Sequence, residues 1–170
     1  MPEIKAIILP TRPQPDTLVA IFLLKRFGKE RFPGIEKAGV EVWTNLPEGK
    51  SAEDLEKDVY VLIDIGGGVF DHHAMRGKTT ASQLVAEHFG VAEDPSLAKL
   101  LEYTRRDDIF GKGTVSEDPI DRTFGLSAII YTLSKNLPNS PQKVVDIILP
   151  ILMMICATPI IIKVMGLLSV

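Results

Sequence analysis

The sequence predicts an α/β domain with a mostly parallel sheet flanked by helices. Short apolar runs rich in β-branched residues alternate with longer segments that carry helix-capping signals, an alternation typical of parallel sheets. The chain has 170 residues, enough for one domain with a sizeable core. Its net charge of -3 gives no global basic field, so a polyanion would have to be bound by a local cluster of cations.

The predicted elements follow from local signals. Strands are predicted over residues 4–9, 40–44 and 59–65, the first of them buried on both faces. Asp16 is predicted as the N-cap of a helix that ends at Gly28. The segment from Thr80 to Gln83 is predicted to form a capping box for a helix that reaches Phe89. Further helices are predicted where a capping residue precedes proline, at Asp94-Pro95, Asp118-Pro119 and Ser140-Pro141.

We divide the chain into an α/β domain over residues 1–139 and an apolar, helical C-terminal segment over residues 140–170. The run 147–162 carries no charge, but it is shorter than the roughly 20 residues of a membrane span, and Pro150 and Pro159 interrupt it. A membrane span is therefore disfavoured. We expect the segment to pack on the domain or to form the interface of a homo-oligomer.

The cellular location follows from two weaker signals. The single cysteine, Cys156, cannot form an intrachain disulfide and is expected to be buried as a small apolar side chain. The N-terminus lacks a signal-peptide pattern. These features predict a cytoplasmic protein.

The most unusual stretch is V-L-I-D-I-G-G-G-V-F-D-H-H, residues 61–73, which holds two of the three histidines. Asp16 and Asp64 each follow a predicted strand, directly or after one turn, so both should lie at the carboxyl edge of the sheet. Together with His72 they could bind a divalent ion such as Mn, Mg or Zn. We expect the three side chains within a few ångströms of one another, and a positive φ in at least one of the glycines at 66–68. The alternative is a Gly-rich turn with an exposed polar tip.

These motifs resemble those of the DHH phosphoesterase superfamily, which includes RecJ-like exonucleases, family II inorganic pyrophosphatases and Myg-type nucleases. The resemblance rests on V-L-I-D-I-G-G-G, on D-H-H and on the following helix T-T-A-S-Q-L-V-A-E-H-F-G, and the order of motifs extends over roughly residues 1–135. It implies a divalent cofactor, with Mn or Mg preferred, and a catalytic role for Asp64 and for His73, which would face the phosphate. The implied metal ligands are Asp16, Asp64, His72 and one of Asp107 or Asp108.

The sequence departs from the family pattern in its first motif. Where the family has further ligands for one of two metals, this chain has Gln14 and either Leu9 or Pro10. The remaining set resembles the ligands of the other metal alone. A pair of metals about 3.5–4 Å apart clamps the attacking water and the phosphoryl group, and one metal would supply less charge. The family's usual C-terminal substrate domain has no counterpart here, which favours a small substrate or a cleft completed by a partner chain.

Basic residues near the motifs are candidates for phosphate binding, although each could be a solvated surface charge. They are Arg76, Lys78, Arg105 and Arg106, with Lys112 and Arg122 nearby. Helical spacing puts Thr104 and Asp108 on one apolar face, but a neighbouring stripe contains Asp107, so the two aspartates are not separated. His88 is expected to be a surface histidine favoured by a helix C-terminus.

The predicted function is that of a divalent-metal-dependent phosphoesterase acting on a nucleotide or oligonucleotide phosphodiester. Its partner would be a phosphorylated small molecule or a short nucleic acid. The alternative is a non-catalytic, DHH-fold scaffold that binds a metal or nucleotide and self-associates through its C-terminal helices.

Overall fold

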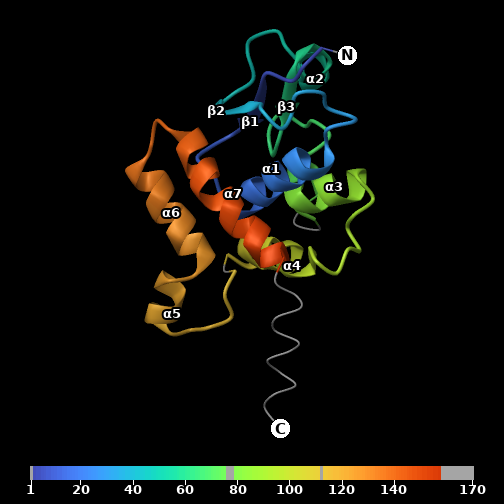
Figure 1. Cartoon of the computed structure of the whole chain (residues 1–170). Coiled ribbons are helices and arrows are strands. Elements are labelled where there is room, and N and C mark those ends of the chain that lie inside the picture. Colours follow the sequence, from blue (N-terminus) through green and yellow to red (C-terminus); the bar gives the residue numbers. More distant parts are fainter. Residues whose placement is uncertain (1, 76–78, 112, 158–170) are drawn as a thin grey trace.

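The protein is described here from a computed structural model, which covers residues 2–75, 79–111 and 113–157. Within these ranges a three-stranded parallel sheet has the order β2-β1-β3 (Figure 1). The strands are β1 (Ala6–Leu9), β2 (Gly39–Val42) and β3 (Tyr60–Leu62). In the central register Ile7 lies opposite Val40 and Val61. The predicted α/β class with a parallel sheet is therefore confirmed.

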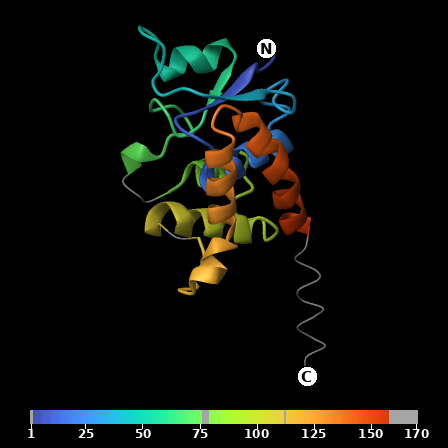
Figure 2. The ribbon, with the colours of Figure 1, turned by 90° about the vertical axis from the view of Figure 1, so that its left-hand side faces the viewer.

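Helices fill most of the remaining chain. They are α1 (Pro15–Phe27), α2 (Ala52–Asp58), α3 (Ala81–His88), α4 (Ala98–Phe110), α5 (Pro119–Thr123), α6 (Leu126–Asn136) and α7 (Pro141–Ala157). Figure 2 shows α2 on one side of the sheet and the other helices on the opposite side.

The central strand β1 and most of β3 are buried on both faces because they carry apolar residues at successive positions, whereas the edge strand β2 buries only Val40. Ile7 and Leu9 face the larger core, which contains α1 and one side of α3, α4 and α7. Ile8 and Leu62 face a smaller core closed by Leu55 of α2. This two-sided burial fixes the carboxyl ends of β1 and β3 next to each other.

Most helix ends agree with the sequence signals, and two do not. The helix predicted to start at Asp94-Pro95 begins only at Ala98, because Asp94 accepts hydrogen bonds from the Ser96 and Leu97 amides and so closes a turn before the helix. Thr80 caps α3 by accepting a hydrogen bond from the Gln83 amide, and Gly28 ends α1. The prediction that Asp16 caps α1 is wrong. Gln14 is the N-cap, because Pro15 takes the first helical position, where its missing N–H costs nothing.

The described part of the C-terminal segment packs on the chain's own core. One face of α7, which includes Val144, Ile148, Leu152 and Cys156, is buried against the helices around α1. Residues 158–170 lie outside the described residues, and self-association stays a prediction. Among the described residues, no helix combines the length and the apolar character that crossing a membrane requires.

Candidate metal centre

The loop between β3 and α3 carries the side chains of the site. Its base is a parallel bridge between Ile63 and Phe70, with the Asp64 amide donating to the Phe70 carbonyl at 3.0 Å. Gly66 and Gly67 have φ values of 76° and 72°, which confirms the predicted positive φ. A Cβ atom on Gly66 would lie 2.6 Å from a methyl carbon of Leu46, so a larger residue would have to displace that side chain in addition to adopting the positive φ.

Asp71 holds the loop in shape. Its carboxylate accepts a hydrogen bond from the Gly67 amide at 2.7 Å and another from the His73 amide at 3.0 Å. It also lies 2.8 Å from Nδ1 of the His73 ring. Burial raises the pKa of Asp71, but these hydrogen bonds outweigh it and the net pKa is below the usual value. Asp71 therefore orients the His73 imidazole.

Two carboxylates and two imidazoles converge beyond this loop. His72 Nε2 lies 2.9 Å from Asp64 Oδ1 and 3.7 Å from Asp108 Oδ2. His73 Nδ1 lies 3.2 Å from the same Asp64 oxygen. Asp64, His72 and His73 can each offer one ligand atom, with all three atoms within 4.8 Å of one another. Metal bonds near 2.0–2.3 Å place the ligand atoms of one ion roughly 3–4 Å apart, so the spacing fits a single divalent cation.

Asp64 has features of an ion ligand that plain packing does not explain. Its φ is 61°, a left-handed conformation uncommon outside glycine and best tolerated by Asn and Asp. Its Oδ1 atom is buried and accepts no hydrogen bond of good geometry, although two imidazole nitrogens approach it, and Nδ1 of His72 is also buried without a partner. Such orphaned polar atoms are uncommon. The buried Asp64 oxygen, approached by imidazole nitrogens but without a well-formed hydrogen bond, is therefore suited to coordination.

The electrostatics of the cluster also favour a cation. The pKa of Asp64 is raised to about 6, chiefly by burial and also by the carboxylates of Asp16 and Asp71, although the nearby His72 and His73 act to lower it. Burial also raises the pKa of Asp108. Carboxylates that are desolvated and close together resist ionisation, and a bound divalent ion would relieve that penalty.

Asp16 lies beside the cluster but is already engaged. The residue is 5% exposed, and its two carboxylate oxygens accept hydrogen bonds from the amides of Ala81 at 2.8 Å and Ser82 at 2.9 Å. These amides begin α3 and carry the partial positive charge of a helix N-terminus. The structure thus brings Asp64 and His72 together as expected and uses Asp16 to join α1 to α3.

The structure separates the two aspartates that helical spacing left unresolved. Asp108, in the last turn of α4, faces His72, whereas Asp107 accepts a hydrogen bond from the Ser127 hydroxyl on α6. The buried Thr104 lies on the same face as Asp108. Asp108 is therefore the member of this pair that contributes to the cluster.

None of the described basic residues that were expected to bind phosphate forms an ion pair with the Asp/His cluster. Arg105 and Arg106 each pair with Glu102, at 2.7 and 2.6 Å. The i,i+3 and i,i+4 spacing of these charges was visible in the sequence and could have predicted the pairs. Arg122 lies on α5 and is exposed. Arg76, Lys78 and Lys112 lie outside the described residues.

His88, the third histidine, does not join the cluster. Its ring packs against Phe70 and Phe32, with centroids 5.2 and 5.8 Å away, and Arg31 donates to its carbonyl at 3.1 Å. The position at the end of α3 agrees with the sequence expectation, but burial and the charge of Arg31 lower the pKa of His88, so the imidazolium is not favoured there.

Comparison of the chain with protein-family models, with curated proteins and with solved structures finds no match. What the fold and site define directly is an α/β protein with a parallel sheet and an Asp/His cluster where β3 ends. The resemblance to the DHH phosphoesterases therefore rests on the sequence motifs alone.

Proposed function

We propose that this protein is a divalent-metal-dependent phosphoesterase of the DHH type, acting on a phosphodiester of a nucleotide or oligonucleotide. The observation that carries the proposal is the approach of both Asp64 and Asp108 to Nε2 of His72, with the exposed His73 beside Asp64. The glycine loop and the strained Asp64 support it, because both hold ligand atoms where unassisted packing would not.

Each side chain has a role that follows from its surroundings. Asp64, His72 and Asp108 would hold one Mn or Mg ion, which when bound polarises a phosphoryl oxygen and lowers the pKa of a coordinated water. The hydrogen bond to Asp71 raises the pKa of His73, so its imidazole stays protonated to higher pH. An exposed imidazolium can donate a hydrogen bond to a phosphate oxygen and a proton to the leaving group. Asp71 keeps that ring in place.

Calorimetric titration of the full chain with Mn, followed by hydrolysis of bis(4-nitrophenyl) phosphate in added Mn, tests the proposal. We expect about one ion per chain and hydrolysis that depends on it. His72→Ala should lose both, whereas His88→Gln changes a histidine outside the cluster and should keep both. A chain that binds no Mn, or that hydrolyses the ester equally well with His72→Ala, would contradict the proposal.

The second candidate is a non-catalytic scaffold of the same fold. It is favoured by Gln14, which stands where the family has a ligand for another metal and whose amide instead donates to the Thr11 hydroxyl at 3.1 Å. Exposed apolar side chains on α7, including Ile147 and Met153, offer a face for self-association. Binding of Mn with no hydrolysis of any phosphodiester, together with a dimer or larger species in sedimentation, would favour this candidate.

A further inference from the structure

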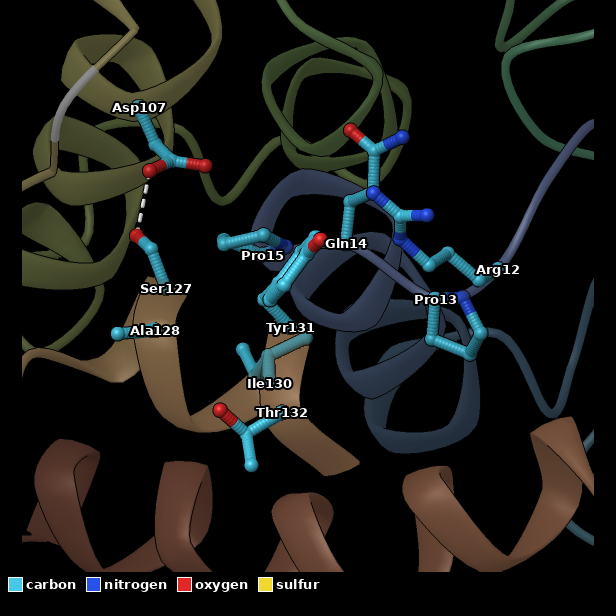
Figure 3. A pocket seen from close by; sticks show the side chains of 10 residues that line it. All are labelled: Arg12, Pro13, Gln14, Pro15, Asp107, Ser127, Ala128, Ile130, Tyr131 and Thr132. Carbon is cyan, nitrogen blue, oxygen red and sulfur yellow. Dashed lines mark hydrogen bonds between the residues drawn. The ribbon is translucent and has the colours of Figure 1, made fainter. Parts of the chain in front are cut away.

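A cavity lies against α4, the helix that carries Asp108 of the candidate metal centre. It has a volume of about 400 Å³ and is formed by residues 12–15, by α6 and by Asp107 of α4. Small-molecule sites typically span roughly 300–1,000 Å³. In Figure 3, Asp107 and Ser127 stand at one end, Arg12 and Gln14 at the other, and the ring of Tyr131 lies between them.

The cavity and the metal centre share two stretches of backbone. Asp107 is the neighbour of Asp108 in α4, and Cα atoms of adjacent residues are about 3.8 Å apart. Gln14 precedes Asp16 by two residues at the start of α1. The cavity and the cluster are therefore neighbours along both stretches of the chain.

Tyr131 provides a surface for a planar group. The residue is 50% exposed, and the guanidinium carbon of Arg12 lies 4.7 Å from the centre of its ring. A guanidinium is itself flat and delocalised and stacks on aromatic faces as a base does. Because Arg12 is exposed, a ligand ring can displace its side chain. The position of Arg12 therefore indicates that this face of the Tyr131 ring can stack on a planar group.

Asp107 provides a fixed acceptor at the other end. One of its oxygens accepts a hydrogen bond from the Ser127 hydroxyl. That hydroxyl lies 2.7 Å from the Tyr103 hydroxyl oxygen, which in turn accepts from the Ser127 amide at 2.9 Å. The chain of contacts holds the carboxylate in one orientation, with its second oxygen directed toward the cavity (Figure 3). A carboxylate at this position selects a ligand that carries N–H donors.

We infer that this cavity is the subsite for a nucleobase bearing an amino group. The base packs on Tyr131, its amino group donates to Asp107, and its phosphate extends toward Asp108 and His72. The position of the phosphate rests on the function proposed above, whereas binding of the base depends only on the cavity.

The full chain is titrated, with a metal chelator present, with AMP, GMP, CMP or ribose 5-phosphate, and binding is followed by ligand-observed NMR. The difference between a nucleotide and ribose 5-phosphate measures the contribution of the base to the affinity. We expect at least one of the three nucleotides to bind more tightly than ribose 5-phosphate. Tyr131→Ala should weaken that binding about ten-fold or more, the range found for loss of one base–aromatic stack, whereas Tyr131→Phe should keep it. If none of the nucleotides exceeds ribose 5-phosphate, or if Tyr131→Ala leaves their binding intact, the inference is wrong.

The role of Asp107 is tested with a matched pair of ligands. AMP and purine riboside 5′-monophosphate differ only in the 6-amino group. The wild-type chain should prefer AMP by about ten-fold, the scale of one good hydrogen bond to a charged acceptor. Asp107→Ala should bind both equally. A preference that persists in Asp107→Ala, or no preference in the wild type, would overturn the assignment of Asp107.

A further variant separates this inference from the proposed function. Asp64→Asn removes the central carboxylate of the metal cluster and leaves the cavity untouched. Base binding that survives in this variant and in chelator supports the subsite, even if the chain never binds Mn. Nucleotide binding that requires both Mn and Asp64 would retain the proposed function and refute the base subsite.

Discussion

Two neighbouring residues of α4, Asp107 and Asp108, occupy unlike environments. Asp108 faces His72 and other carboxylates in a region where burial raises its pKa. Asp107 faces a serine hydroxyl and a cavity lined by Tyr131. Successive positions on a helix point about 100° apart. One turn of helix can therefore serve an ion on one side and an organic ligand on the other.

The two regions also differ in how they are held. The Asp/His cluster depends on a strand end and on a loop whose glycines adopt positive φ. The cavity depends on helix ends and on the proline-containing segment 12–15, with hydroxyl groups fixing its carboxylate. Substitutions in the first region should affect metal binding and loop geometry, whereas substitutions in the second should affect only organic ligands.

The largest expected effect comes from changing the two aspartates separately. Asp108→Ala should weaken Mn binding by about 100-fold or more, because loss of an outer-shell partner alone typically weakens it by about 10–100-fold. Asp107→Ala should change it by less than about two-fold. Calorimetric titration of both variants measures the difference. Equal losses would mean that the two aspartates belong to one site.

Asp16→Ala tests whether Asp16 stabilises the fold through α3 or serves as a metal ligand. It leaves the buried amides of Ala81 and Ser82 without an acceptor, and hydrogen bonds to a charged group contribute about 1.5–3 kcal/mol each, with incomplete additivity. We expect the free energy of unfolding to fall by about 2–3 kcal/mol in urea with chelator present. Asp16→Asn, which keeps one acceptor oxygen, should lose about half as much. An unchanged stability without metal would assign Asp16 to the ligand set instead.

The glycine loop offers an internal control. Gly66→Ala should destabilise the chain by about 2 kcal/mol, because it combines a positive φ with a clash against Leu46. Gly67→Ala has the same backbone conformation but open space around the new methyl group, and about 1 kcal/mol is expected. Chemical denaturation measures both. Weaker Mn binding should accompany Gly66→Ala, since this loop carries His72; unaltered binding would leave the loop as a simple connection.

The smallest effect concerns the pH dependence of the metal-free chain. The folded-state pKa of Asp64 is raised from 3.8 to about 6, so the stability this group contributes is present at low pH and is lost as the pH rises through about 6. Asp64→Asn removes that loss. At pH 8 in chelator the variant should exceed the wild type by about 1 kcal/mol, and the gain should vanish near pH 4. A gain independent of pH would show that ionisation of Asp64 is not its cause.

Much of the fold was predictable because local signals agree with it. The three strands were placed by their apolar runs, and Thr80 and Asp118 were recognised as caps. Helix α2 was missed although Ser51 and Asp54 form a reciprocal capping box, since its short sequence carries a weak apolar pattern. Helix α6 was not distinguished from the helix that begins at Pro119, because only Phe124 and Gly125 separate the two in the sequence.

The candidate site was predictable only in part. The closeness of Asp64 and His72 followed from the strand end and the glycine loop. The sequence did not predict that Asp16 would accept hydrogen bonds from α3, nor which of Asp107 and Asp108 would face His72. Both depend on how the helices are rotated about their axes when they pack. Hydrophobic periodicity does not fix that rotation to the precision of one residue. The contribution of Tyr131 to a cavity was not foreseen, because it arises from contact between segments more than a hundred residues apart.

The link from Asp16 to the start of α3 has a consequence for how the chain folds. The two hydrogen bonds connect Asp16 to amides that lie 65 and 66 positions further along the chain. Strand β1 must also pair with β3 across a similar separation. Such distant contacts form late, because the entropy of closing the intervening chain is lost before they stabilise anything. The Ala81 and Ser82 amides, which would exchange rapidly at an uncapped helix start, should gain protection from hydrogen exchange only when α1 docks on α3. The appearance of that protection would mark the moment at which the site is assembled.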